Sequence, residues 1–302
     1  MKPLLLHLHT YLRWYILLFF CLVSIAVWSV ILREDRRGVL TFAALDIGQG
    51  DALWIESPTG TQVVVDGGPA NALLRELPRV LPWYDKHIDM LVVTNPDKDH
   101  YEGFLSLLKN YSVDAVLESG TLSKTDTYAL LEKEIADKHI PRILGRRGEV
   151  VDLGDGARFE ILFPDRDVTN TSSNDGSLVM RLVYGDTSVL LQGDSTANVE
   201  HYLFGLDGTR LKSTILKAGH HGSRTSSTLE YVQEVAPQFA VMSSGALNSY
   251  GHPHKETLDT FERLGIPALD TCVMGRIVFH SDGTKFTLEN KIQPVSAGCK
   301  VN

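Results

Sequence analysis

The sequence predicts an α/β domain with two mixed β-sheets, preceded by a single membrane-spanning helix. An uncharged apolar run covers residues 14–32, short β-rich runs begin at residue 40, and segments with helical periodicity alternate with further apolar runs. No repeat, low-complexity tract or Pro/Ser-rich linker interrupts the chain after residue 40. We therefore expect one domain over residues 38–290, followed by a short tail at 291–302.

Residues 1–37 are expected to hold a membrane anchor. The apolar run from Trp14 to Leu32 is long enough to cross a hydrocarbon core as a helix. A cleaved signal peptide is the rival interpretation, because Ser24 and Ala26 are small residues at the spacing of a cleavage site, but the apolar run continues beyond them. Basic residues flank the run on both sides, namely Lys2, Arg13, Arg33, Arg36 and Arg37. Charge alone therefore leaves the orientation of a single-pass anchor open.

Composition narrows the class of protein. The chain is 43% hydrophobic and 22% charged, which is typical of a globular protein rather than a disordered one. From residue 38 onward the net charge is about −11, which repels a polyanion at long range. Cys21 lies in the apolar run, and Cys272 and Cys299 are too few for the disulfide framework of a small secreted scaffold. The fold must rest on its apolar core.

The elements follow from local patterns along the chain. Strands are expected at residues 40–47, 51–57 and 61–68, and the continuous apolar run at 89–94 is typical of a strand covered on both faces. Two hairpins, over residues 177–194 and 276–289, have Gly-Asp or Asp-Gly at their turns. Helices are expected at residues 100–109, 125–139, 196–204, 226–235 and 254–264. Because the strands are apolar on both sides, these helices should pack outside the sheets.

Asp and His residues recur at the ends of the predicted strands, where sites form in α/β folds. They are Asp66, Asp97, Asp99, His100, Asp194, His220, His221, His252 and His254. Each alone has an ordinary explanation as part of a turn, a helix cap or a loop. Together they supply the ligand types of a divalent metal, in clusters beside Gly or Pro. The pattern indicates a metal site.

The order of motifs resembles the metallo-β-lactamase-fold hydrolases, and within them the hydrolase domain of the ComEC family of competence DNA-uptake proteins. The motifs are LDIGQGDALWI, VVVDGGP, VVTNPDKDHYEGF, NDGSLVMRL, LLQGD, LKAGHHGSRTSS and NSYGHPH, and they span nearly all of the chain after the anchor. The resemblance implies an αββα four-layer sandwich with a metal site at one edge, preceded here by the N-terminal transmembrane helix.

The resemblance also implies the ligands of one or two divalent ions. One ion would be held by Asp99, His100 and His252. The other would be held by Asp97 and one histidine of the pair His220 and His221, with Asp194 bridging the two ions. Asn95 stands where the family usually has histidine, and its amide is a weak ligand. Because oxygen ligands replace imidazoles, we expect Mn²⁺ or a mixed site, with Zn²⁺ as the other candidate.

Further roles are expected around these ligands. Asp66 would orient a ligand from beneath the site, and His254 would donate a proton to the leaving group or cap a helix. Ser223 and Arg224 would contact a substrate phosphate or form a helix cap. The residues Asp46, Gln49 and Asp51 would shape the neighbouring loop or cap a turn.

Taken together, the resemblance implies a phosphodiesterase or nuclease that uses a metal-activated hydroxide, acting on a phosphodiester such as single-stranded DNA. It implies an extracytoplasmic domain and, because one span cannot form a DNA channel, a membrane partner that does. Two alternatives stay open. One is a cell-surface phosphoesterase, such as a choline-phosphate esterase, and the other is a catalytically weak binding or assembly component of a DNA-uptake complex.

Overall fold

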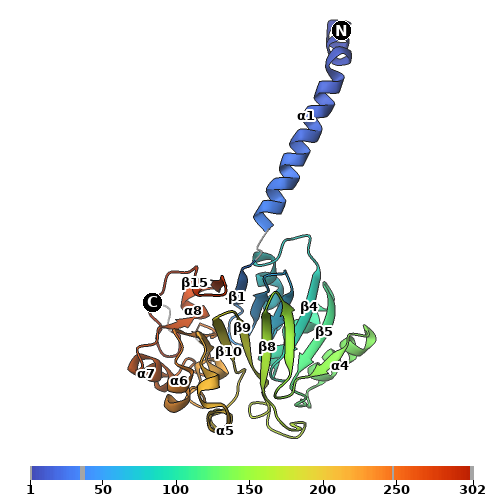
Figure 1. The fold of residues 1–302 in the computed structure, drawn as a ribbon. Helices are drawn as coiled ribbons and strands as arrows, with labels where there is room; N and C mark the ends of the chain where they lie inside the picture. Colours follow the sequence, from blue (N-terminus) through green and yellow to red (C-terminus); the bar gives the residue numbers. More distant parts are fainter. Residues whose placement is uncertain (1, 35–37, 247, 300–302) are drawn as a thin grey trace. The chain divides into compact units, whose positions relative to one another are not determined.

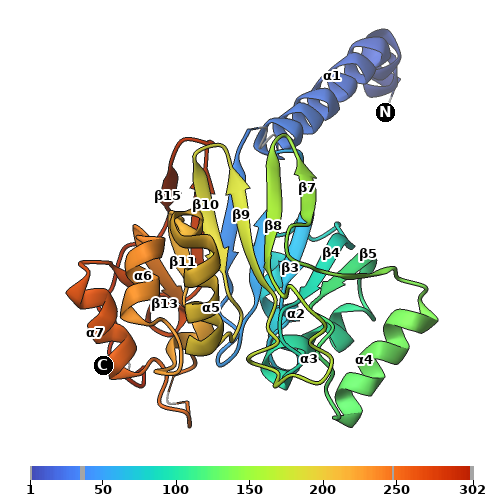
Figure 2. The same cartoon turned by 60° about the horizontal axis from the view of Figure 1, so that its bottom comes forward.

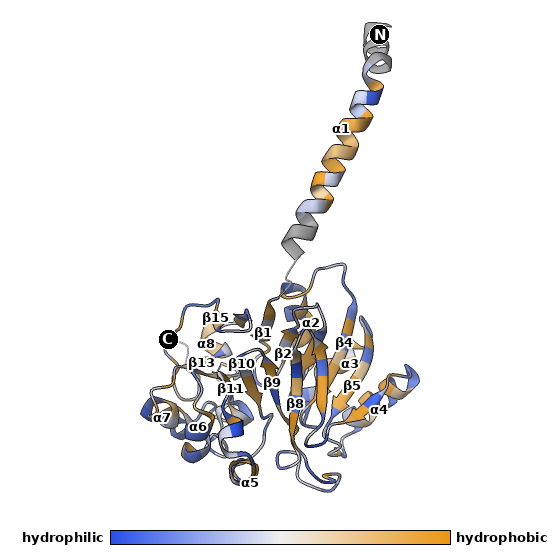
Figure 3. Cartoon of the chain, viewed as in Figure 1, coloured by the Kyte–Doolittle hydropathy of each residue, from blue (hydrophilic) through white to orange (hydrophobic). Residues whose placement is uncertain are grey.

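The computed structural model describes residues 2–34, 38–246 and 248–299, and the chain divides into two units, Met1–Arg37 and Gly38–Asn302. Unit 1 contains helix α1 (Lys2–Glu34). Its stretch Tyr11–Ser29 is long and apolar enough to cross a membrane, as the colours of α1 in Figure 3 show. This stretch overlaps the predicted span at 14–32. Arg36 and Arg37 lie outside the described residues.

Two β-sheets form the centre of unit 2 (Figure 1). In spatial order, the first contains β15 (Phe286–Leu288), β14 (Ile277–Ser281), β1 (Leu40–Ala44), β2 (Leu53–Glu56), β3 (Gln62–Val65), β4 (His87–Val93), β5 (Ser112–Glu118) and β6 (Arg142–Leu144). The second contains β13 (Ala268–Asp270), β12 (Phe239–Met242), β11 (Ile215–Lys217), β10 (Thr187–Leu191), β9 (Val179–Tyr184), β8 (Ala157–Phe163) and β7 (Val150–Gly154).

Helices cover the outer faces of both sheets, as Figure 2 shows. The first sheet carries α2 (Ala72–Glu76), α3 (Lys98–Leu107) and α4 (Asp126–Asp137). The second carries α5 (Ala197–Asp207), α6 (Leu229–Val235) and α7 (Lys255–Arg263), while the short α8 (Thr271–Met274) follows β13. The layers are therefore helix, sheet, sheet, helix, which confirms the predicted αββα sandwich.

The alternation of side chains along each strand produces these layers. In β2, the side chains of Leu53 and Ile55 lie in the core between the sheets, while Trp54 packs against the helices of the first sheet. All three are buried, because both faces of the sheet are covered. Burial on both faces explains why the strands are continuous apolar runs in the sequence.

Strand direction places the ends that matter for function. Strands β3, β4 and β5 run parallel, as do β10, β11, β12 and β13, so the C-terminal ends within each set lie at one edge of their sheet. β1 is antiparallel to β2, which is antiparallel to β3, so β1 points the same way as β3. Gly38, where unit 2 begins, precedes β1 and therefore lies at the opposite edge.

The predicted elements largely match the observed ones. The three early strands, the strand at 89–94 and both hairpins are present. Helix α3 begins at Lys98 rather than at residue 100, with the backbone of Asp97 in the extended conformation of an N-cap. As a consequence, Asp99 and His100 lie in the first turn of a helix, whose backbone holds them at fixed positions.

Candidate metal centre

Loops at the C-terminal ends of four strands bring the predicted ligands together. They are Asp97, Asp99 and His100 after β4, Asp194 after β10, His220 and His221 in the 3₁₀ turn Gly219–Gly222 after β11, and His252 after β12. The ring centroids of His100 and His221 are 5.2 Å apart, and those of His220 and His252 are 5.4 Å apart. Residues far apart in the sequence thus form one compact cluster.

Asp194 lies at the centre of this cluster. Its Oδ2 atom is 3.1 Å from Nε2 of His100 and 3.7 Å from Nε2 of His220, and its Oδ1 atom is 3.6 Å from Nε2 of His221. Its side chain is buried. A carboxylate that faces three imidazoles with both oxygens is suited to bridge metal ions, which is the role the resemblance implied.

Asp99 approaches the same point from α3. Its Oδ2 atom is 3.4 Å from Nε2 of His221, and ligand atoms of Asp99, His100 and His221 all lie within 4.8 Å of one another. The resemblance implied His252 as the third member of this group, whereas the structure brings His221 there. With Asp194, these residues supply two carboxylates and two imidazoles around one point.

The backbone of the turn Gly219–Gly222 explains how adjacent histidines both enter the cluster. His220 has φ 50° and ψ 47°, and His221 has φ 55° and ψ 27°, so both adopt the left-handed conformation. This conformation costs about 1–3 kcal/mol for each residue other than glycine. Two consecutive left-handed residues turn both rings into the site, and such stored strain is typical of functional positions.

Carboxylates hold two of the histidines through their other ring nitrogen. Nδ1 of His100 is 2.9 Å from Oδ2 of Asp66, and Nδ1 of His221 is 3.2 Å from Oδ1 of Asp51. A carboxylate only accepts, so Nδ1 of each histidine donates to it and Nε2 is the ring nitrogen that faces the site. Asp66 has the position expected of it, whereas the sequence indicated Asp51 only as a loop residue.

A buried lysine completes the support of His221. Nζ of Lys217 is 2.8 Å from Oδ1 of Asp51 and donates to the carbonyl oxygen of Ala218. Both charged side chains are buried, so the ion pair is shielded from water. Lys217 therefore keeps Asp51 ionised and fixed beneath His221.

His252 is held differently. Its Nδ1 atom is 3.3 Å from Nε2 of Gln49, and Oε1 of Gln49 accepts from the N–H of Gly245, which fixes the orientation of the amide. Nδ1 of His252 therefore accepts, and Nε2 carries the proton of the neutral ring. The ring of Tyr250 stacks on His252 with centroids 5.6 Å apart and planes 22° apart.

Asn95 is engaged in building the loop after β4. Its Oδ1 atom accepts from the N–H of Asp97, and its Nδ2 atom donates to Oδ1 of Asn174, at 2.9 Å in both cases. The side chain is fully buried. The carboxylate of Asp97 is half-buried and accepts from the hydroxyl of Ser173. The contacts of Asn95 favour a structural role at the position where the family usually has a histidine.

The remaining predicted residues lie beside the cluster. His254 caps α7, its ring centroid is 4.9 Å from that of His252, and its Nδ1 atom accepts from the N–H of Arg224. Ser223 is buried, and its hydroxyl accepts from the N–H and hydroxyl of Thr225. The exposed Arg224 side chain lies 3.8 Å from Glu256. Ser223 thus supports the loop, while Arg224 is open to solvent.

The charges of the cluster are strongly coupled. Burial opposes the charged form of His221, but Asp194 and Asp51 outweigh it and raise the pKa of His221 to about 10. His100 shows the same balance, and Asp194 with Asp66 raises its pKa well above the usual value. Burial and the neighbouring His221 and His220 lower the pKa of His252 to about 3. Metal binding at His100 and His221 must therefore displace protons.

Unpartnered buried atoms show that these residues fit a metal. Among the described residues, Nε2 of His100, Nε2 of His221 and Oδ1 of Asp194 are buried without a well-directed hydrogen bond, although carboxylate oxygens lie 3.1 Å from Nε2 of His100 and 3.4 Å from Nε2 of His221. Buried polar atoms of this kind are rare, and each calls for an explanation such as an ion. All three atoms point to the same place, and imidazole nitrogen and carboxylate oxygen are suitable ligands for Zn²⁺ or Mn²⁺.

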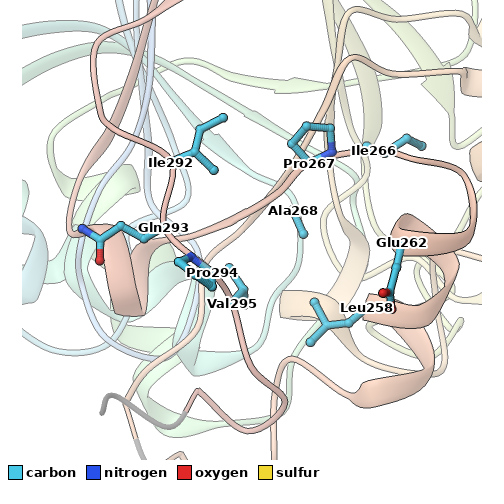
Figure 4. A pocket seen from close by; sticks show the side chains of 9 residues that line it. All are labelled: Leu258, Glu262, Ile266, Pro267, Ala268, Ile292, Gln293, Pro294 and Val295. Atoms are coloured by element: carbon cyan, nitrogen blue, oxygen red, sulfur yellow. The ribbon is translucent and has the colours of Figure 1, made fainter.

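A separate hollow of about 550 Å³ lies between α7 and the tail (Figure 4). Leu258 of α7 and Val295 of the tail line it, and none of its lining residues belongs to the histidine cluster. Its lining is mostly apolar, with Glu262 and Gln293 as its polar side chains, and it contains no histidine. The hollow is therefore distinct from the candidate metal centre.

An αββα sandwich with Asp and His ligands at the strand ends defines a class of metal-dependent hydrolases. Residues 45–245 match the family described as the Metallo-beta-lactamase superfamily. The chain therefore belongs to this superfamily, whose members are generally metal-dependent hydrolases and whose fold implies divalent metal binding.

The curated relatives confirm the resemblance to ComEC-like proteins. The chain is 29% identical over 262 residues to ComE operon protein 3 of Bacillus subtilis, covering 78% of this chain and 32% of the relative. It is 29% identical over 234 residues to Competence protein ComA of Neisseria gonorrhoeae, covering 78% and 31%. The chain thus spans about a third of the length of these relatives.

Solved structures show the same fold. The metallo-beta-lactamase fold protein YhfI from Bacillus subtilis matches with a TM-score of 0.54 and 13% identity, over 80% of this chain and 100% of that one. The diiron beta-hydroxylase CmlA from Streptomyces venezuelae matches with a TM-score of 0.52 and 15% identity, over 79% of this chain and 53% of that one. At such identities the likeness concerns the fold alone.

Proposed function

We propose that this chain is a membrane-anchored, metal-dependent phosphodiesterase of ComEC-like type that cleaves nucleic acid. The observation that carries the proposal is the group of Asp99, His100, Asp194 and His221, whose ligand atoms converge. Phosphodiester hydrolysis is a natural reaction for a divalent site of carboxylates and imidazoles. The similarity to competence proteins supports nucleic acid as the substrate.

These four residues would hold one divalent ion, and His220, whose Nε2 atom is 3.7 Å from Oδ2 of Asp194, would with Asp97 hold a second. A bound ion supplies Lewis-acid chemistry, which activates water and stabilises charge on phosphate oxygens. Carboxylate oxygens favour Mn²⁺, and imidazoles suit Zn²⁺ as well. The engagement of Asn95 with its loop makes the second position the weaker one.

His254 is suited to contact the leaving oxygen. Because its Nδ1 atom accepts from the backbone N–H of Arg224, the neutral ring carries its proton on Nε2. That N–H group can donate a hydrogen bond to the leaving oxygen of a cleaved phosphodiester, whereas transfer of a proton as general acid requires the imidazolium form and hence loss of the bond from Arg224. The neighbouring Arg224 side chain is exposed and cationic, so it can pair with a non-bridging phosphate oxygen.

We place residues 38–290 and the tail outside the cytoplasm and α1 in the membrane, and Val295 of the tail packs on the domain. The structure pairs Cys272 of α8 with Cys299 of the tail as a disulfide, with Cα atoms 6.3 Å apart. Disulfides are rare in the cytosol, which supports an oxidising compartment. A single span cannot conduct DNA, so a membrane partner would supply the channel.

The test uses the purified full chain in detergent, with bound metal measured alongside Mn²⁺-dependent cleavage of single-stranded DNA and of bis-p-nitrophenyl phosphate. Asp99→Ala should abolish metal binding and cleavage of both substrates. Asp186→Ala, at an exposed carboxylate in the turn between β9 and β10, is the matched control and should leave both unchanged. Cleavage of the small diester alone would refute nuclease activity and indicate a surface phosphoesterase.

A folded, metal-free and inert protein would refute hydrolysis altogether. It would support the second candidate function, a binding or assembly component, which the engagement of Asn95 with its own loop favours.

A further inference from the structure

Tyr250 is an exposed aromatic residue at the edge of the metal centre. Its side chain is 63% exposed, although one ring face stacks on His252. The ring of His252 in turn lies 5.4 Å from that of His220, whose Nε2 atom faces Asp194. The rings of Tyr250, His252 and His220 thus form a line of contacts from the solvent to Asp194.

The loop that presents Tyr250 is held by hydrogen bonds. Asn248 donates from Nδ2 to the carbonyl oxygens of Gly245 and His252, and its Oδ1 atom accepts from the N–H of His252. These contacts close the loop on both sides of Tyr250. The ring is therefore presented in a fixed position, which lowers the entropy lost when a partner stacks on it.

We propose that Tyr250 is a stacking platform for an unpaired base of a single-stranded nucleic acid, next to the phosphodiester at the metal centre. This inference rests on the proposed function and narrows its substrate to strands with accessible base faces. A duplex hides those faces, whereas an unpaired base can lie on the outer face of the tyrosine ring. Stacking tolerates any base, so the platform binds strands without sequence preference.

The charge of the domain gives stacking a particular importance. With about −11 from residue 38 onward, long-range attraction of a polyanion is absent, so contacts with the sugar and phosphate backbone alone hold a strand weakly. An uncharged contact such as stacking is not weakened by this field. Tyr250 supplies it beside the site, and Arg224 supplies a local cation.

The alternative is that Tyr250 only supports His252, and substrates separate the two roles. We would compare the full chain with Tyr250→Ala and Tyr250→Phe on one single-stranded oligonucleotide, and on the same oligonucleotide with abasic sites. Tyr250→Ala should raise KM for the base-bearing strand by about 5- to 150-fold, as loss of one base stack does, and leave the abasic strand unchanged. Tyr250→Phe should behave like the wild type.

Equal loss on both strands, or no loss on either, would overturn the proposal. The same variants are also tested on a choline-bearing phosphodiester, because a tyrosine face attracts a quaternary ammonium group as well. If Tyr250→Ala loses activity on that substrate alone, the proposal is overturned. Bound metal is measured in each variant to exclude damage to the centre, and Tyr84→Ala, at a second exposed tyrosine in the loop before β4, is the matched control. If the wild type cleaves neither strand, the phosphodiesterase proposal fails, and fluorescence anisotropy with the same two oligonucleotides decides on the platform alone.

Discussion

The series of hydrogen bonds from Lys217 through Asp51 to His221 predicts that Asp51→Asn lowers metal affinity and stability, and that the two effects can be measured separately. The carboxylate of Asp51 accepts from Nζ of Lys217 and from Nδ1 of His221. An asparagine keeps the shape but loses the charge. Its oxygen at the position of Oδ1 would still accept from Nδ1 of His221 and from Lys217, but a neutral amide holds the imidazole less firmly and makes Nε2 a weaker metal ligand than the carboxylate does.

Two magnitudes follow from the burial of this chain of contacts. Lys217 and Asp51 are both about 1% exposed, so removing the negative partner leaves a buried ammonium unpaired, at a cost of about 3–5 kcal/mol. For a protein of this size that lowers Tm by roughly 6–20 °C. Loss of the residue that orients a metal-binding histidine lowers metal affinity by about 10- to 100-fold.

Calorimetric titration with Mn²⁺ and thermal unfolding in EDTA measure the two effects separately. The control is Asp51→Asn combined with Lys217→Met, which removes the unpaired ammonium. The double variant should regain most of the lost stability while its metal affinity stays low. Unchanged affinity in Asp51→Asn would refute the reasoning that the carboxylate of Asp51 makes His221 a stronger metal ligand.

Three further predictions concern the surroundings of the site. A Cβ at Gly50 would clash with the carbonyl oxygen of Asp99, whereas a Cβ at Gly48 meets open space. Gly50→Ala should therefore reduce bound metal, and Gly48→Ala should not. Equal metal content in the two variants would contradict this. Burial raises the pKa of Asp270 to about 6 despite hydrogen bonds from Cys272 and Ser244. The folded state therefore holds this proton more tightly than the unfolded state does. As a result, the free energy of unfolding falls as pH rises from about 4 to 6. Asp270→Asn should therefore be more stable than wild type at pH 8 by up to about 3 kcal/mol and equal at pH 3, and a gap independent of pH in denaturant titrations would refute this. Cys299→Ser should lower the free energy of unfolding by about 2–4 kcal/mol in denaturant titrations under oxidising conditions, because the disulfide closes a loop with a sequence separation of 27. If the wild type without reductant is no more stable than the variant, this prediction is contradicted.

Local patterns predicted the elements of the sandwich well where a strand or helix has a clear periodicity of apolar residues. The meander of β1, β2 and β3 follows from apolar runs separated by turn residues. The start of α3 was predicted two residues late, because Asp97 reads as part of a charged turn and its extended backbone is visible only in the structure. Short strands such as β11 (Ile215–Lys217) have too few residues for a period to be recognised.

The site was predictable in its residue types and less so in its pairings. Clusters of Asp and His at strand ends indicated a metal, since those ligand types are informative by themselves. The partners of the histidines were not predictable, because Asp51 and His221 are 170 residues apart and Gln49 and His252 are 203 apart. The approach of His221 to Asp99 depends on two consecutive left-handed residues, a conformation that is uncommon outside glycine and that the sequence did not indicate here.

The direction of β1 has a consequence for how a substrate arrives. The polypeptide enters unit 2 at one edge of the sheet, and the histidine cluster lies at the other, beyond the C-terminal end of β4, whose 7 residues span about 23 Å. Under the proposed function, a longer segment between α1 and Gly38 should therefore extend the reach of unit 2 from the membrane and leave the rate of phosphodiester cleavage unchanged. Attachment and proposed chemistry would then belong to opposite edges of the same sheet.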